Sequence, residues 1–433
     1  MATNSAALQD SASPADIYAG IGSVSEIVAL AALVTSTARK PANAHIHLPP
    51  NFSAFDTVEQ AVQLAADQGI RVLGANNYYD YSVYTQFGTQ CAEKGILALY
   101  GTEIICMIDS LRNAGVKLND PGNPGKMYLC GKGISRFAPL STEGAALLNT
   151  IRKNDSSRMA EMVKKLSECC AEAGLSVRLT EAGVKQMVVE RHGCSPTTVY
   201  LQERHVAQAL QEAIENEIAP EERSAALEKL FGTTAKSAPD DRAGIQNEIR
   251  SHLMKAGKKA FVPETFVDFD HARKLILALG GVPCYPILAD GASPLCGYEE
   301  NTQKLASETR ARGLHCTELI PVRNSPEQVL RYAKAMREAG FIVTAGTEHN
   351  TRDLIPLEPT CLNGEPIPDE ALAIFWEGAC VVAAHQFLVT NERSGFVDGS
   401  GALAGKYSSP DARIKHLAAV GAAVIEAVTR SKA

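Results

Sequence analysis

Short apolar segments that end in polar residues, each followed by an amphipathic helix, recur along this chain. Three such segments occur between residues 41 and 103, with helical stretches between them. They are apolar on both faces, which is typical of strands in a parallel sheet covered by helices. The pattern resumes near residue 261 and continues to about residue 350. The sequence therefore predicts an α/β protein whose strands form a parallel sheet or barrel.

The sequence between the two groups of strands is of another kind. A turn-rich loop at 119–125 is followed, from about residue 150, by apolar residues at helical spacing and by no convincing strand. The clearest helical face is formed by Met159, Met162, Val163, Leu166 and Cys170. We predict five parts: an N-terminal helical extension (1–40), the first part of the barrel (41–150), a helical insertion (151–262), the second part of the barrel (263–355) and C-terminal helices packed on the barrel (356–433).

Composition limits the partners that the protein can have. A net charge of −7 without basic runs argues against large nucleic acids and membrane surfaces, but it allows a small anionic substrate if a metal supplies positive charge. Eleven cysteines without CxxC pairs indicate reduced thiols. The apolar run at 27–34 is too short to cross a membrane. We expect a cytoplasmic protein, and the sequence makes no prediction about its oligomeric state.

Polar side chains follow nearly every predicted strand. His45 and His47 are two residues apart on an extended segment, so they face the same way and form half of a chelate. In a barrel of parallel strands, the residues that follow the strands converge at one rim. The others in such positions are Asn77, Glu103, Asp290, Glu318, Glu348 and His349. Mixed imidazole and carboxylate groups favour a divalent metal ion, so we predict a metal-dependent site.

These motifs resemble those of the PHP (polymerase and histidinol phosphatase) superfamily of metal-dependent phosphoesterases. Segment 45–47 looks like the first motif of that family, and 101–103 is similar to its Gly-x-Glu motif, in which the glutamate bridges metals. Segment 203–210 resembles the helix that supplies a further histidine in members with a helical insertion, and 346–350 approximates the closing Gly-Ser-Asp-x-His motif. The resemblance spans roughly residues 41–355.

The resemblance implies a distorted βα barrel of about seven parallel strands with a helical insertion. It also implies one or two divalent ions (Mn²⁺, Fe²⁺ or Zn²⁺), and three if every position of the family's site is kept. The predicted metal ligands are His45, His47, Glu103, His205 and Glu348. The predicted catalytic or orienting residues are Tyr78, Asn77 and His349, and the predicted substrate-binding residues are Asp290, Arg323 and Lys132.

The sequence departs from the family pattern at three motifs. In the closing motif, Glu348 stands in place of the aspartate and His349 comes one position early. Asn-Asn-Tyr stands at 76–78 where the family has Thr-Asp-His, and Cys-Tyr-Pro stands at 284–286 near the position of its Ala-His-Pro. We expect a hydrolase that uses a metal-activated water on a small phosphate ester or nucleotide. Two alternatives stay open: an amidohydrolase-like enzyme that cleaves a C–N or C–O bond, and a catalytically degenerate barrel that acts as a binding protein.

Overall fold

The computed structural model describes residues 13–33 and 38–431, so part of the predicted N-terminal extension lies outside the described residues. Seven strands form a nearly closed, barrel-shaped sheet in the order β1-β2-β3-β4-β6-β7-β8, and short β5 pairs with β3. A single bridge between Ile46 and Glu348 links the β1 and β8 edges. The strands are β1 (Ala42–Ile46), β2 (Val72–Ala75), β3 (Leu97–Met107), β4 (Lys126–Lys132), β5 (Val267–Asp268), β6 (Val282–Ile287), β7 (Cys316–Leu319) and β8 (Ile342–Ala345).

Strand β4 differs from the predicted parallel arrangement, because it runs antiparallel to both of its neighbours, β3 and β6. No strand was predicted at residues 126–132. The turn-rich loop at 119–125 lets the chain reverse without a crossover helix, and such a reversal produces an antiparallel pair. This strand brings residues 126–132 beside the C-terminal half of β3, where the predicted site lies.

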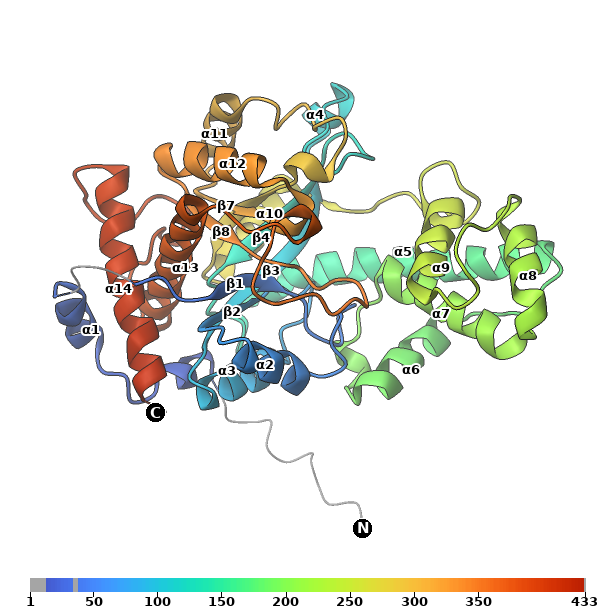
Figure 1. The fold of residues 1–433 in the computed structure, drawn as a ribbon, viewed down its shortest axis with the longest axis horizontal. Coiled ribbons are helices and arrows are strands. Elements are labelled where there is room, and N and C mark those ends of the chain that lie inside the picture. The colour runs from blue at the N-terminus through green and yellow to red at the C-terminus, as the bar shows by residue number, and fades with distance from the viewer. Residues whose placement is uncertain (1–12, 34–37, 432–433) are drawn as a thin grey trace, which may run out of the picture.

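Helices surround the sheet (Figure 1). Thr57 caps α2 by accepting a hydrogen bond from Gln60 N, and the helix buries Val58, Ala61, Val62 and Ala65. Ser325 precedes α12, but its hydroxyl donates to Asp290 and makes no cap. The helices of the barrel are α2 (Val58–Asp67), α3 (Tyr84–Glu93), α10 (Phe269–Ala278), α11 (Thr302–Ala311) and α12 (Pro326–Glu338), with short α4 (Asp109–Asn113) beside β4.

The segment between β4 and β5 is helical and extends away from the barrel, on the right of Figure 1. Its helices are α5 (Thr142–Glu172), α6 (Glu181–His192), α7 (Glu203–Glu217), α8 (Arg223–Phe231) and α9 (Arg242–Ile249). Leu148 and Ile151 of α5 belong to the barrel core, whereas Met159 and Met162 belong to a second core within the insertion. The one continuous helix therefore couples the insertion to the barrel.

The C-terminal helices α13 (Asp369–Thr390) and α14 (Pro410–Arg430) pack on each other and on the barrel, with α1 (Val24–Ala31) beside α14. Gly378 lets α13 approach the backbone of Val343 in β8, where a Cβ atom would lie 1.9 Å from the carbonyl oxygen. Helix α13 is long and apolar enough to cross a membrane, but 72% of its apolar window is buried in the protein. Its apolar character is explained by packing in the core.

Candidate metal centre

Three donor atoms from β1 and β3 meet at one point of the barrel interior. The Nε2 atom of His45 lies 3.3 Å from Oε2 of Glu103, and Nε2 of His47 lies 3.2 Å from the same oxygen. The two Nε2 atoms are 3.4 Å apart. Donor atoms about 2.0–2.2 Å from a tetrahedral ion lie about 3.3–3.6 Å from one another. The spacing of these three atoms is therefore that of ligands around one cation.

The Oε2 atom of Glu103 gives a direct test of whether a cation fits this point. It is buried and has no hydrogen-bond partner among the described residues, although it faces two imidazole nitrogens. Burial raises the pKa of the Glu103 carboxyl group, but His45 and His47 outweigh burial and hold that pKa below its ordinary value. An ionised, unpartnered carboxylate oxygen beside two imidazoles fits a divalent cation.

The backbone at the end of β1 explains why both histidines point inward. The His47 N–H donates to the Glu348 carbonyl oxygen at 2.8 Å, and the His45 carbonyl oxygen accepts from Glu348 N at the same distance. This pairing keeps residues 45–47 extended, so residues two apart share a face. The segment after β8 therefore holds the His-x-His motif in place.

A buried ion pair lies behind His45. The Nδ1 atom of His45 is 2.7 Å from Glu318 Oε2, and Nζ of Lys132 is 2.5 Å from Glu318 Oε1. Burial raises the pKa of Glu318, but Lys132 and His45 outweigh it, so the net shift is downward. An ionised Glu318 keeps Nδ1 of His45 protonated, so a metal ion would take the place of the proton on Nε2. The sequence predicts Glu318 at the end of a strand and predicts no role for it.

Lys132, predicted to bind substrate, does not line the cavity described below. Its side chain is fully buried, and its ammonium group also donates to the Ala44 carbonyl oxygen and to Asn76 Oδ1, each at 3.1 Å. An unneutralised Glu318 would be costly in this interior. The structure therefore gives Lys132 the role of balancing that charge.

Tyr78 contacts the donor cluster directly. Its hydroxyl donates to Glu103 Oε1 at 2.5 Å, and its ring stacks on His47 with the centroids 5.2 Å apart. Burial, and then the charge of Glu103, raise the pKa of Tyr78 well above its ordinary value, so the phenol stays protonated. The hydroxyl leaves the second oxygen, Oε2, pointing at the histidines. Tyr78 thus orients the carboxylate.

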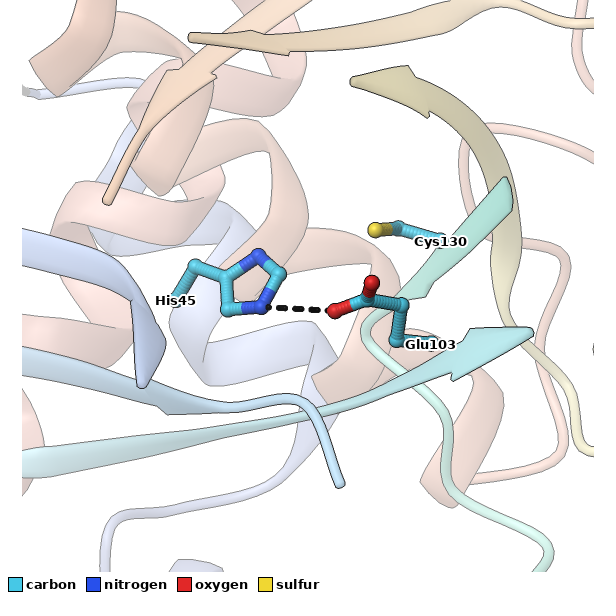
Figure 2. Close-up of side chains that lie close together, drawn as sticks. All are labelled: His45, Glu103 and Cys130. Atoms are coloured by element: carbon cyan, nitrogen blue, oxygen red, sulfur yellow. Dashed lines mark ion pairs between the residues drawn. The ribbon is translucent and has the colours of Figure 1, made fainter. Parts of the chain in front are cut away.

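Cys130 was not among the predicted site residues. It lies opposite Glu103 in the β3–β4 register, and its sulfur and donor atoms of His45 and Glu103 all lie within 4.8 Å of one another (Figure 2). The sequence did not lead us to predict strand β4, so Cys130 was not placed beside Glu103. The available signal was the alternation of side chains in residues 126–132 after a turn-rich loop.

Glu348 and Arg323 pair with each other at the cavity wall. The two guanidinium nitrogens of Arg323 contact the two carboxylate oxygens of Glu348, and Asn350 donates to Oε2 at 2.6 Å. Both residues line the same cavity as His45. The carboxylate of Glu348, which was predicted as a metal ligand, is therefore paired with Arg323 and Asn350 in the structure.

Two other predicted site residues, His349 and Asn77, make hydrogen bonds to the loops around the site. His349 contacts Thr347 through Nδ1 at 2.6 Å and the Ile355 carbonyl oxygen through Nε2 at 2.9 Å. The Asn77 side chain bridges the backbone of Leu48, accepting from N at 2.8 Å and donating to O at 2.9 Å. Neither lines the cavity. The structure places these two side chains where they hold the rim together, and it brings neither into the cluster.

Asp290 and His205 are also set apart from the cluster. Asp290 Oδ2 accepts from the Ser325 hydroxyl at 2.7 Å, which fixes the start of α12. His205 accepts from Gln202 N at 3.1 Å and so caps α7. Burial lowers the pKa of His205 to about 3, which keeps it neutral. Its position on α7 is the predicted one, but its ring packs against Phe52 and is not part of the cavity lining.

The cluster opens on a cavity of about 370 Å³ between the barrel and the insertion. His45, Tyr78 and Glu103 line one part of it, and cationic side chains line another part. These cations are Lys126, Arg158, Arg204, Arg250 and Lys255. The nearby carboxylate of Glu203 is shared by Arg158 at 2.8 Å, Lys255 at 3.0 Å and Arg250 at 3.7 Å.

Arg204 and Arg250 have unused donors on this cavity. Arg204 has no ion pair with any residue that the structure describes, and burial lowers its pKa to about 10, so it stays charged at neutral pH. The buried Nε of Arg250 likewise has no hydrogen-bond partner in residues 13–33 and 38–431. At this cavity, Arg204 therefore makes no ion pair with the described residues, and Arg250, which is paired with Glu203, keeps a free Nε donor.

No protein-family model matches the chain, and no curated protein matches it. Among solved structures, the chain is similar to a protein from Bifidobacterium adolescentis described as a candidate metal-dependent phosphoesterase. The identity is 18%, the TM-score is 0.50, and the match covers 79% of this chain and 98% of that one. An amidohydrolase from Chromobacterium violaceum, solved with sulfate and no metal, matches at 15% identity with a TM-score of 0.49, over 77% and 96% of the two chains. The first likeness confirms the predicted phosphoesterase-type barrel as a fold.

Proposed function

We propose that this protein is a metal-dependent hydrolase of a small phosphate ester. The observation that carries the proposal is the meeting of His45 Nε2, His47 Nε2 and Glu103 Oε2 within 3.2–3.4 Å at a cavity that is also lined by the guanidinium group of Arg204. The three donor atoms suit a divalent ion, and the cationic lining of the cavity suits an anionic substrate.

His45, His47 and Glu103 would hold the ion, which when bound supplies Lewis acidity and a lowered pKa for water. The protein's own residues do the positioning. Glu318 fixes the tautomer of His45, and Tyr78 holds one oxygen of Glu103 so that the other faces the site. Each of these contacts is buried, so water does not compete for the donor atoms.

The cationic part of the cavity supports a phosphate ester as the substrate. A phosphate group offers several oxygens to a planar guanidinium, which binds two at once. The unpaired Arg204 and the free Nε of Arg250 are donors of this kind. The cavity is also lined by the carboxyl groups of Glu103, Asp120, Asp155, Glu203 and Glu348, so the donors free for an anion are those of Arg204 and Arg250.

A substrate panel tests this proposal. Phosphate monoesters and diesters, a lactone and an N-acyl amide are incubated with metal-loaded protein, with and without a chelator. We expect phosphate release that the chelator abolishes and readdition of metal restores. Cleavage of the lactone or amide without phosphate release would instead assign the amidohydrolase-like alternative. Metal binding without turnover of any ester would contradict the proposed activity and favour a binding protein.

Two variants make the assay specific to the site. His47→Ala removes one donor of the cluster, and we expect it to lower phosphate release by at least about 100-fold. His416→Ala is the control, because His416 is exposed on α14, lies near Tyr407 and is not part of the cavity lining. An equal loss of phosphate release in both variants would show that the loss does not come from the metal site.

A further inference from the structure

Cys130 is placed beside the donor cluster by the sheet itself. It is the direct partner of Glu103 in the antiparallel β3–β4 pair, and directly opposed residues project from the same face. Figure 2 shows the sulfur and the Glu103 carboxylate on the side of the sheet that His45 also faces. The sulfur lies within 4.8 Å of donor atoms of both residues, and Cys130 is fully buried.

The unpartnered oxygen of Glu103 is an independent sign that something binds at this point. Oε2 is buried, faces the two Nε2 atoms of His45 and His47, and accepts no hydrogen bond from any described residue. A buried carboxylate oxygen without a partner costs free energy unless a ligand satisfies it. The sulfur of Cys130 borders the same point.

We propose that Cys130 is a thiolate ligand of this metal site, which makes the site selective for a thiophilic ion such as Zn²⁺ over Mg²⁺ or Mn²⁺. The inference rests on the proposed metal centre, and it deepens that proposal by naming the class of ion. His45, Glu103 and Cys130 provide one imidazole, one carboxylate and one thiolate whose donor atoms lie within 4.8 Å of one another, and His47 Nε2 lies 3.2 Å from the same carboxylate oxygen. Imidazole, carboxylate and thiolate are the ligand types that bind Zn²⁺. Thiolates favour Zn²⁺, whereas carboxylate and water ligands suit Mg²⁺ and Mn²⁺.

Binding of a divalent ion by Cys130 and Glu103 conserves both charge and protons. When the sulfur binds the cation, the S–H bond breaks and its proton passes to solvent, so uptake of the ion releases a proton. The resulting thiolate and the Glu103 carboxylate together carry two negative charges, which match a divalent cation. No oxidant or reductant takes part.

Neighbouring thiols provide the matched control. Cys284 is the register partner of Cys130 on β6, and Cys316 is the partner of Cys284 on β7. Cys316 is as fully buried as Cys130 but lies two strands farther from Glu103 and outside the cluster. Cys316→Ser therefore reproduces the loss of a buried thiol in the same sheet without touching the donor set.

Cobalt spectroscopy tests the proposal without an assay of activity. Protein stripped of metal by a chelator is titrated with Co²⁺ as the wild type, Cys130→Ser and Cys316→Ser. We expect sulfur-to-cobalt charge-transfer absorption in the wild type and in C316S, and its loss in C130S while the visible d–d bands persist. Zn²⁺ affinity should fall by more than about tenfold in C130S, whereas Mn²⁺ affinity should change little.

The outcomes separate this inference from the proposed function. Visible d–d bands without charge transfer in the wild type would overturn the thiolate ligand and leave the His45, His47 and Glu103 centre intact. A charge-transfer band that survives in C130S would assign the sulfur to another cysteine and also overturn the inference. Failure of the wild type to bind Co²⁺ or Zn²⁺ at all would overturn both proposals. Circular dichroism shows whether each variant is folded.

Discussion

The Nδ1 atom of His45 lies 2.7 Å from Oε2 of Glu318, and both side chains are shielded from solvent. This contact sits on the side of the imidazole away from Glu103, so it sets which nitrogen faces the cluster. Lys132 neutralises the other oxygen of Glu318. Lys132, Glu318 and His45 thus form a buried series of contacts that ends at the nitrogen proposed to bind the metal, and each contact can be tested separately.

Glu318→Gln should weaken metal binding by about 10–100-fold, because the amide no longer holds the imidazole through a charged hydrogen bond. It should also lower the free energy of unfolding by about 3–5 kcal/mol, since the buried Lys132 loses its partner. Adding Lys132→Met should recover most of the stability and none of the metal affinity. Metal titration and urea unfolding measure the two effects. Unchanged metal affinity in Glu318→Gln would contradict the role of the pair.

Tyr78→Phe should keep the stack on His47 but remove the hydrogen bond to Glu103. We expect metal affinity to fall by about tenfold and the free energy of unfolding to fall by about 1 kcal/mol. Tyr79→Phe is the control, because its ring is adjacent and buried but its hydroxyl does not contact Glu103. Equal metal affinities for the two variants, measured by competition with a chromophoric chelator, would show that Tyr78 does not orient the carboxylate.

Arg204→Gln should raise KM for an anionic substrate by about 10–100-fold and change kcat little, because the side chain lies in the cavity wall and outside the donor cluster. Arg242→Gln is the matched control: it is also in the insertion, but it is exposed and paired with Glu215. Steady-state kinetics at varied salt measures the effect. A fall in kcat with KM unchanged would contradict a role in substrate binding.

His385 gives a pH dependence of stability that is separate from the metal site. Its Nδ1 accepts from Phe396 N and its Nε2 contacts the Gly280 carbonyl oxygen, each at 2.9 Å. Burial lowers the pKa of His385 to about 4 in the folded protein. Between pH 6.5 and 4 the unfolded chain therefore binds the proton that the folded chain excludes, so stability falls as the pH falls.

The expected size is about 2 kcal/mol between pH 7.5 and pH 5. Urea unfolding of the wild type and of His385→Gln at both pH values measures it. The destabilisation caused by the substitution should be smaller at pH 5 than at pH 7.5 by this amount. A constant difference between the two proteins at both pH values would show that His385 does not titrate on unfolding.

The sequence predicted the parts of the site that depend on local pattern. His45, His47 and Glu103 meet because side chains alternate along a strand and because neighbouring strands bring their ends together. The barrel and its helices also follow from local periodicity. The pairing of Cys130 with Glu103 depends on the antiparallel strand β4. This strand follows short α4 and a turn-rich loop, with no crossover helix, and local periodicity does not indicate such a pairing.

The orientation of residues after β8 also could not be predicted from alternation. Glu348 and His349 both adopt left-handed backbone angles, with φ of 61° and 47°. Two consecutive residues in this region break the extended alternation, so Glu348 turns to Arg323 and His349 turns to Thr347. The ion pair of Lys132 with Glu318 likewise joins residues 186 positions apart, which only the folded barrel brings together.

The central claim is that His45, His47 and Glu103 hold a metal ion. Anomalous diffraction from crystals grown with Zn²⁺ tests it most directly, with data collected on both sides of the zinc absorption edge. The account predicts an anomalous peak bounded by the two Nε2 atoms and Oε2 of Glu103, and its absence in Glu103→Gln. A wild-type map without a peak there, or with the ion held by other side chains, would contradict the account.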